Sequence, residues 1–123
     1  MTGSTPIPLC RLDELADPGS RGMVIRHAGS DYHVFVVRRG DRAHAYLNSC
    51  PHTGAPLDWV QDQFLSPDQS HIQCAMHAAL FRLEDGVCVA GPCAGQALTR
   101  FPVAVEDGRV MLFPAQFRVP VRG

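Results

Sequence analysis

The chain has 123 residues, 46% of them hydrophobic, and a formal net charge of −1. This length fits a single domain over residues 1–123, and the balanced charge excludes an electrostatic partnership with nucleic acid. No apolar run could span a bilayer and the first residues lack a secretory signal, so we expect no membrane partner and a cytoplasmic location.

The predicted elements begin with residues 10–17, the only stretch with helical character, which Pro18 and Gly19 end. Runs of β-branched and aromatic residues between turn residues then predict short strands. They cover residues 22–26, 31–39, 43–49, 70–74, 80–84, 87–91, 98–106 and 109–113. The Asp-Gly pairs at 85–86 and 107–108 match two-residue type I′ hairpin turns. The sequence therefore predicts an all-β fold of antiparallel strands.

The stretch from Asn48 to about Phe81 interrupts this pattern with prolines and little alternation. Long irregular loops inside a compact domain are usually functional. This stretch holds two Cys/His pairs, Cys50 with His52 as C-x-H and Cys74 with His77 as C-x-x-H. We therefore expect a β scaffold that carries a site built from loops.

Thiolates and neutral imidazoles are ligands of zinc, iron and copper. The chain has an odd number of cysteines and no export signal, which argues against a disulfide framework. These cysteines are Cys10, Cys50, Cys74, Cys88 and Cys93. Each Cys/His pair is chemically mixed, unlike the uniform halves of a zinc finger, so two adjacent metals could divide the ligands by type. A single structural Cys2His2 zinc site is the alternative.

The motif Cys50-Pro51-His52-Thr53-Gly54, together with Cys74-x-x-His77, resembles the Rieske [2Fe–2S] proteins. The resemblance extends over about residues 10–113, through a hairpin, a Gly-Pro segment and two closing strands. It implies a Rieske-like antiparallel β-sandwich or barrel with a loop-built cluster-binding subdomain at about 46–82. It also implies one [2Fe–2S] cluster per chain, with Cys50 and Cys74 on one iron and His52 and His77 on the other.

Departures from the high-potential members of that family predict a low reduction potential. Those members bridge their cluster loops with a disulfide, where this chain has Ala55 and Met76. They also donate hydrogen bonds to the cluster from a serine and a tyrosine, where Ala79 and Phe81 cannot donate. Rieske potentials span about −150 to +300 mV, and we expect this one at the low end. Voltammetry at pH 7 checks this, and a value well above zero would contradict it.

Residues outside the four ligands receive structural interpretations. We expect Cys10, Cys88 and Cys93 to be buried thiols, and the remaining histidines to be surface or core residues. Trp59 and Phe64 lie in the 57–70 loop, in a segment longer than the family usually has, and either pack it onto the scaffold or form a docking patch. The tail after Phe113 either adds an edge strand or contacts another subunit. The remaining histidines are His27, His33, His44 and His71.

The predicted function is electron transfer without catalysis, so no catalytic residues are assigned. The chain has no room for the mononuclear iron domain of a Rieske oxygenase and no Gly-rich dinucleotide motif. The resemblance then implies a soluble ferredoxin, a dioxygenase component that takes electrons from a flavin reductase and delivers them to a terminal oxygenase. The alternatives are the Rieske-like small subunit of a larger reductase, such as an assimilatory nitrite reductase, and a zinc-stabilised interaction module.

Overall fold

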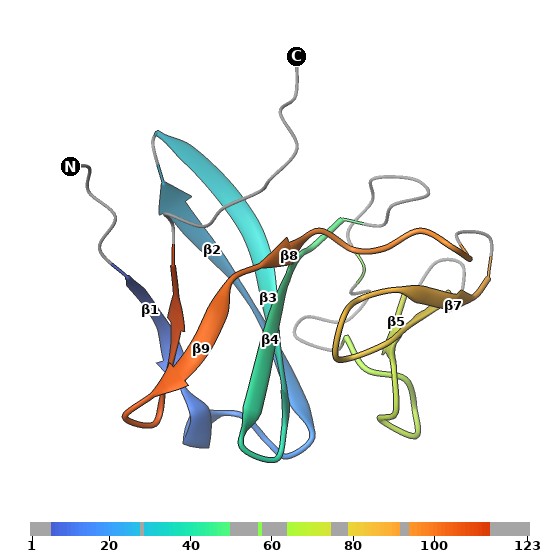
Figure 1. Cartoon of the computed structure of the whole chain (residues 1–123), viewed down its shortest axis with the longest axis horizontal. Helices are drawn as coiled ribbons and strands as arrows, with labels where there is room; N and C mark the ends of the chain where they lie inside the picture. The colour runs from blue at the N-terminus through green and yellow to red at the C-terminus, as the bar shows by residue number, and fades with distance from the viewer. Residues whose placement is uncertain are drawn as a thin grey trace.

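Three antiparallel sheets make up the computed structural model, which describes residues 6–27, 29–49, 57, 64–74, 79–91 and 94–113. The first sheet has the order β1 (Ile7–Arg11), β10 (Arg109–Leu112), β9 (Val103–Glu106). The second has the order β2 (Gly19–His27), β3 (Ser30–Arg39), β4 (Arg42–Leu47), β8 (Arg100–Phe101). The third has the order β5 (Ile72–Gln73), β6 (Leu80–Phe81), β7 (Cys88–Ala90). Figure 1 shows β5 and β7 on the opposite side of the molecule from β1 and β9.

Strand β3 separates two hydrophobic cores because successive side chains of a strand point to opposite faces. Val34 and Val36 belong to the core shared with the first sheet, and Phe35 and Val37 belong to the core shared with the third sheet. All four are at most 1% exposed. A strand buried on both faces has a continuous apolar run instead of alternation, which explains the sequence VFVV at 34–37. The second sheet is therefore the middle layer of the fold.

The all-β prediction is confirmed, and each predicted strand has a counterpart, although Pro102 divides 98–106 into β8 and β9. The predicted helix at 10–17 is wrong. Residues 7–11 form edge strand β1, paired with β10, and only Leu12–Glu14 turn, as a 3₁₀ helix (η1). The half-buried guanidinium of Arg38 donates hydrogen bonds to the carbonyl oxygens of Leu12 and Leu15, at 3.2 and 2.9 Å, and these bonds hold the turn on the sheet.

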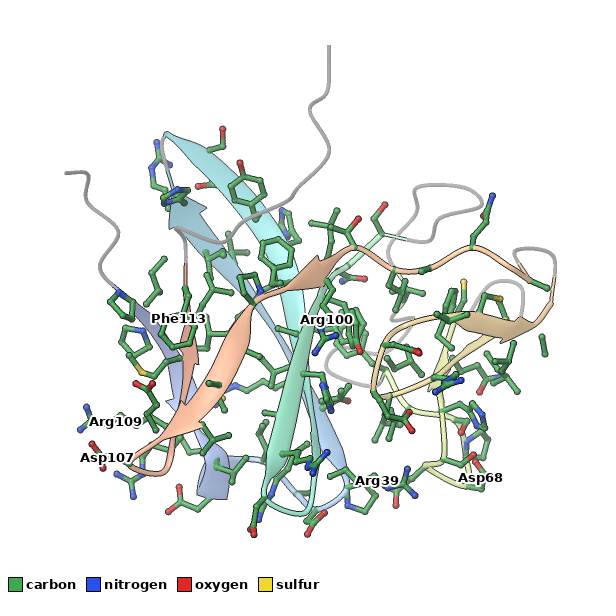
Figure 2. The ribbon with its side chains drawn as sticks, in the orientation of Figure 1. Arg39, Asp68, Arg100, Asp107, Arg109 and Phe113 are labelled. Atoms are coloured by element: carbon green, nitrogen blue, oxygen red, sulfur yellow. The ribbon has the colours of Figure 1, made fainter. Side chains whose placement is uncertain are left out.

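The two Asp-Gly pairs form different turns. Asp107 and Gly108 both have positive φ, +53° and +74°, and join paired residues of β9 and β10, as a type I′ turn requires. Figure 2 shows Asp107 at the outer tip of this hairpin. At 85–86 the type I′ prediction is wrong, because only Gly86 has a positive φ and its N–H donates to the carbonyl of Arg82 at 3.0 Å. This turn is longer, and its backbone at Gly86 packs closely on the ring of Tyr46.

Gly86→Ala will destabilise the fold more than Gly108→Ala, and the two variants form a matched pair. Both glycines have φ near +74°, where an L side chain costs about 1–2 kcal/mol. A Cβ at Gly108 meets nothing within 4 Å, whereas at Gly86 it would lie 2.8 Å from Cε1 of Tyr46. Overpacking of this kind adds about 1–3 kcal/mol to the loss. Urea denaturation measures the difference, and equal losses would contradict the close packing.

Candidate functional site

Cys74, the first residue of the second predicted ligand pair, directly follows β5 in the β5–β6 hairpin. Gln73 pairs with Leu80, and the N–H of Cys74 then donates to the carbonyl of Ala79 at 2.9 Å, which closes the hairpin. Cys74 is a free thiol and only 1% exposed. His77 lies in the segment 75–78, outside the described residues. The hairpin thus fixes one predicted thiolate ligand at the buried base of the second loop.

The first predicted pair follows the end of β4. The N–H of Asn48 donates to the carbonyl of His33 at 2.8 Å, so the chain stays attached to β3 beyond the last residue of β4. After Ser49, the next residue that the structure describes is Leu57, and its N–H donates to Oδ1 of Asn48 at 2.7 Å. Cys50 and His52 fall between them, outside the described residues. The two ends of this segment therefore meet at one side chain.

The bases of both segments converge on one core. Cys74 and Leu57 belong to the same hydrophobic cluster, together with Ala79 and Phe81, and all four are 0–1% exposed. In the described ranges, no three His, Cys, Asp or Glu side chains gather as metal ligands. Of the four predicted ligands only Cys74 is described, so whether Cys50, His52 and His77 join it stays a prediction.

A third segment approaches the same place from β7. Gly91, at φ +104°, lies so close to β6 that an added Cβ would be 2.8 Å from Cα of Ala79. The chain then returns, and the N–H of Cys88 donates to the carbonyl of Gln96 at 2.7 Å. Glycine is needed at 91 because any side chain would collide with the strand that follows the second ligand loop. The first residue of the predicted Gly-Pro segment thus lies directly against Ala79, which follows the second ligand segment in the sequence.

The donor chemistry fits a thiolate- and imidazole-ligated group. Cys74 presents a soft sulfur donor from a buried position, on a hairpin held by backbone hydrogen bonds. The chain matches the family described as "Rieske [2Fe-2S] domain" over residues 5–120. The chain belongs to the Rieske [2Fe–2S] family. The predicted cofactor, a [2Fe–2S] cluster, follows from that membership.

Solved structures of Rieske proteins resemble this one over most of its length. The ferredoxin of carbazole 1,9a-dioxygenase from Nocardioides aromaticivorans IC177 is 28% identical, with a TM-score of 0.70, and the match covers 90% of this chain and 99% of that one. The terminal oxygenase of carbazole 1,9a-dioxygenase from Novosphingobium sp. KA1 is 25% identical, with a TM-score of 0.70, over 89% of this chain and 30% of that one. No curated protein gave a significant sequence match.

The 57–70 loop of this Rieske chain is attached to the scaffold where the structure describes it. Phe64 is fully buried and stacks on Phe35, with ring centroids 4.2 Å apart and planes 4° apart. Its N–H donates to Oγ of Ser20 at 3.2 Å. The packing interpretation is confirmed for Phe64, and Trp59 lies outside the described residues. Beyond Phe64, hydrogen bonds from Ser66 and Ser70 lower the pKa of Asp68 to about 2, at the outer turn seen in Figure 2.

Two other cysteines are described, and neither forms a disulfide with Cys74. Cys88 is buried, as predicted, and its Sγ donates to the carbonyl of Ala90 at 3.2 Å. Cys10 is only half-buried, on β1, because an edge strand has one open side, and this burial raises the pKa of its thiol. Cys93 lies outside the described residues. No disulfide joins the three cysteines that the structure describes, as the sequence indicated.

The four remaining histidines are all at least partly exposed, so none is a fully buried core residue. His44 is half-buried on β4, where burial and then the positive charge of Arg100 lower the pKa of its imidazole. Nδ1 of His71 lies 2.7 Å from Oγ of Ser70, in the turn that Asp68 organises. None of the described helices is long and apolar enough to cross a membrane.

Residues that hold the site together were not identified from the sequence. The hydroxyl of Tyr46, at the end of β4, donates to the carbonyl of Leu83 at 2.6 Å and joins the second sheet to the turn of the third. Burial raises the pKa of this phenol, which keeps it protonated as a donor. Asn48 and Gly91 also join neighbouring segments, Asn48 through its hydrogen bond from Leu57 and Gly91 through its close approach to Ala79. Their only sequence signal is position, directly before or after a ligand loop.

Proposed function

We propose that this Rieske protein is a one-electron carrier, a ferredoxin that receives electrons from a flavin reductase and delivers them to a terminal oxygenase. Cys50 and Cys74 would bind one iron of its cluster, and His52 and His77 the other. Residues of about 46–82 would form the cluster-binding part of a single domain. The protein would work in the cytoplasm and would not itself be an enzyme.

The observation that carries this proposal is the match to a free-standing ferredoxin over nearly the full length of both chains, 90% of this one and 99% of that one. The match covers only 30% of the oxygenase chain, so this chain resembles only a part of that enzyme. The match to the Rieske family also favours an iron–sulfur cluster over a structural zinc site.

The residues of this chain would support electron transfer by limiting the movement of the ligands and by excluding water from them. A [2Fe–2S] cluster held by these four ligands would supply one-electron chemistry. Cys74 would donate its thiolate from a site where Leu57, Ala79 and Phe81 exclude water, each fully buried. The hydrogen-bonded hairpin and the bond from Leu57 to Asn48 would limit movement of the ligand loops. A rigid and desolvated ligand set reorganises little between oxidation states, which favours fast transfer.

Reduction by a purified flavin reductase of an oxygenase system tests the proposal. On anaerobic mixing with reductase and NADH, the visible absorbance of the protein will bleach, and later addition of oxidised terminal oxygenase will restore it. Failure of the reductase to bleach a coloured protein, with tight binding to the large subunit of a reductase, would favour the small-subunit alternative. A colourless protein that contains zinc would overturn both.

A further inference from the structure

Asn48 connects the two ends of the segment that carries the first predicted ligand pair. Its backbone N–H donates to the carbonyl of His33 on β3, at 2.8 Å, and its side-chain Oδ1 accepts from the N–H of Leu57, at 2.7 Å. It is the only asparagine in the chain and is half-buried. Asn48 thus connects the start of the segment to the second sheet through His33. It also connects the start of the segment to its end through Leu57.

The two anchor points differ in what surrounds them. On the side of β4, the N–H of Leu47 also donates to the carbonyl of Thr99, at 2.9 Å, so the strand end is held by two neighbouring segments. On the other side, Leu57 is fully buried in the same core as Cys74. The hydrogen bond from Leu57 to Asn48 therefore connects the start of the first ligand segment to the core that also contains Cys74, where the second ligand segment starts.

Asparagine suits this task for chemical reasons. The N–H of Leu57 needs an acceptor, because an unpaired backbone donor in a buried setting costs free energy. The short amide side chain offers a carbonyl oxygen close to its own backbone, a geometry that favours Asn and Asp in turns. Unlike aspartate, asparagine adds no negative charge beside a thiolate-ligated cluster.

We propose that Asn48 is a positioning residue for the cluster, holding closed the segment that contains Cys50 and His52. This inference rests on the ligand set given under the proposed function. Without the bond, the segment gains conformational freedom, and the two ligands leave the metal more readily because closing the loop again costs entropy. Residues that orient metal ligands typically change metal affinity about 10–100-fold when they are replaced.

Three variants of the cluster-loaded protein test the role. Asn48→Ala should lose its visible absorbance about 10-fold faster or more in the presence of an iron chelator, with shifted lines in the electron paramagnetic resonance (EPR) spectrum of the reduced protein. Asn48→Asp keeps an acceptor oxygen, so its cluster should persist as in the unmodified protein, at a lower potential because of the added charge. Ser20→Ala removes the same kind of bond, from the N–H of Phe64, and should leave the EPR spectrum unchanged.

The outcomes separate this inference from the proposed ligand set. If the unmodified protein lacks the EPR signal of mixed nitrogen and sulfur ligation, the ligand set fails. If it has that signal and Asn48→Ala matches it in both lifetime and EPR lines, the positioning role is wrong. Equal acceleration in Ser20→Ala would also overturn it, because general loosening would then suffice. Should Asn48→Ala not fold, Asn48→Gln replaces it, since the extra methylene moves the acceptor away, and the same loss is expected.

Discussion

Cys74→Ala will yield a folded protein without its cluster. The thiol is predicted to bind one of the two irons, and the other described cysteines, Cys10 and Cys88, are not among the predicted ligands. We expect complete loss of iron, acid-labile sulfide and visible absorbance. The core that the second sheet shares with the first sheet contains no predicted ligand, so the far-ultraviolet circular dichroism of the scaffold should persist. Iron analysis after anaerobic reconstitution is the measurement.

Cys88→Ala is the matched control, because Cys88 is also a buried cysteine of the third sheet, 3% exposed. It should bind two irons per chain and keep the spectrum of the unmodified protein. Full iron content in Cys74→Ala would remove Cys74 from the ligand set, and iron loss in both variants would indicate damage to the fold instead of to the ligands. His52→Ala and His77→Ala should each lose the cluster or change its EPR spectrum.

Phe64→Ala will destabilise the protein by about 3–5 kcal/mol, the usual cost of removing a fully buried phenylalanine. Phe64 stacks on Phe35 in the core that also holds Cys74 and Leu57, so its loss leaves a cavity in that core. The midpoint of urea denaturation, followed by circular dichroism, should fall accordingly. The cluster should also be lost at a lower urea concentration, since the predicted ligand Cys74 is buried in this core.

Val24→Ala serves as the control for this experiment. Val24 lies on β2 and is 56% exposed, so its truncation should change stability by no more than about 0.5 kcal/mol. A loss in Phe64→Ala as small as that in Val24→Ala would contradict the burial of Phe64 and reopen the docking interpretation of the 57–70 loop.

The sequence predicts most of the fold because the strands carry strong local signals. The apolar run of β3 and the turn at Asp107 and Gly108 are local features with well-defined physical meaning. Strand β1 was missed because the stretch after Pro8 is rich in helix formers. Pairing with β10 holds residues 7–11 in an extended conformation instead. The Asp85–Gly86 turn was misassigned because an Asp-Gly pair alone does not distinguish a type I′ turn from a longer turn in which only the glycine has a positive φ.

The candidate site is predictable in its ligand types and not in its supporting contacts. Cysteines and histidines at close spacing indicate metal chemistry by themselves, and the loop motifs indicate the family. The bond from Leu57 to Asn48 and the close approach of Gly91 to Ala79 join segments that meet only after folding. Residue type alone does not distinguish such contacts from ordinary loop positions.

An EPR study of the reduced protein, labelled with ¹⁵N-histidine, tests the central claim most directly. Our account predicts an average g value below that of an all-cysteine [2Fe–2S] cluster, with hyperfine coupling to two histidine nitrogens, from His52 and His77. A spectrum without nitrogen coupling, or a protein that gives no signal because it binds a single zinc ion, would contradict the account.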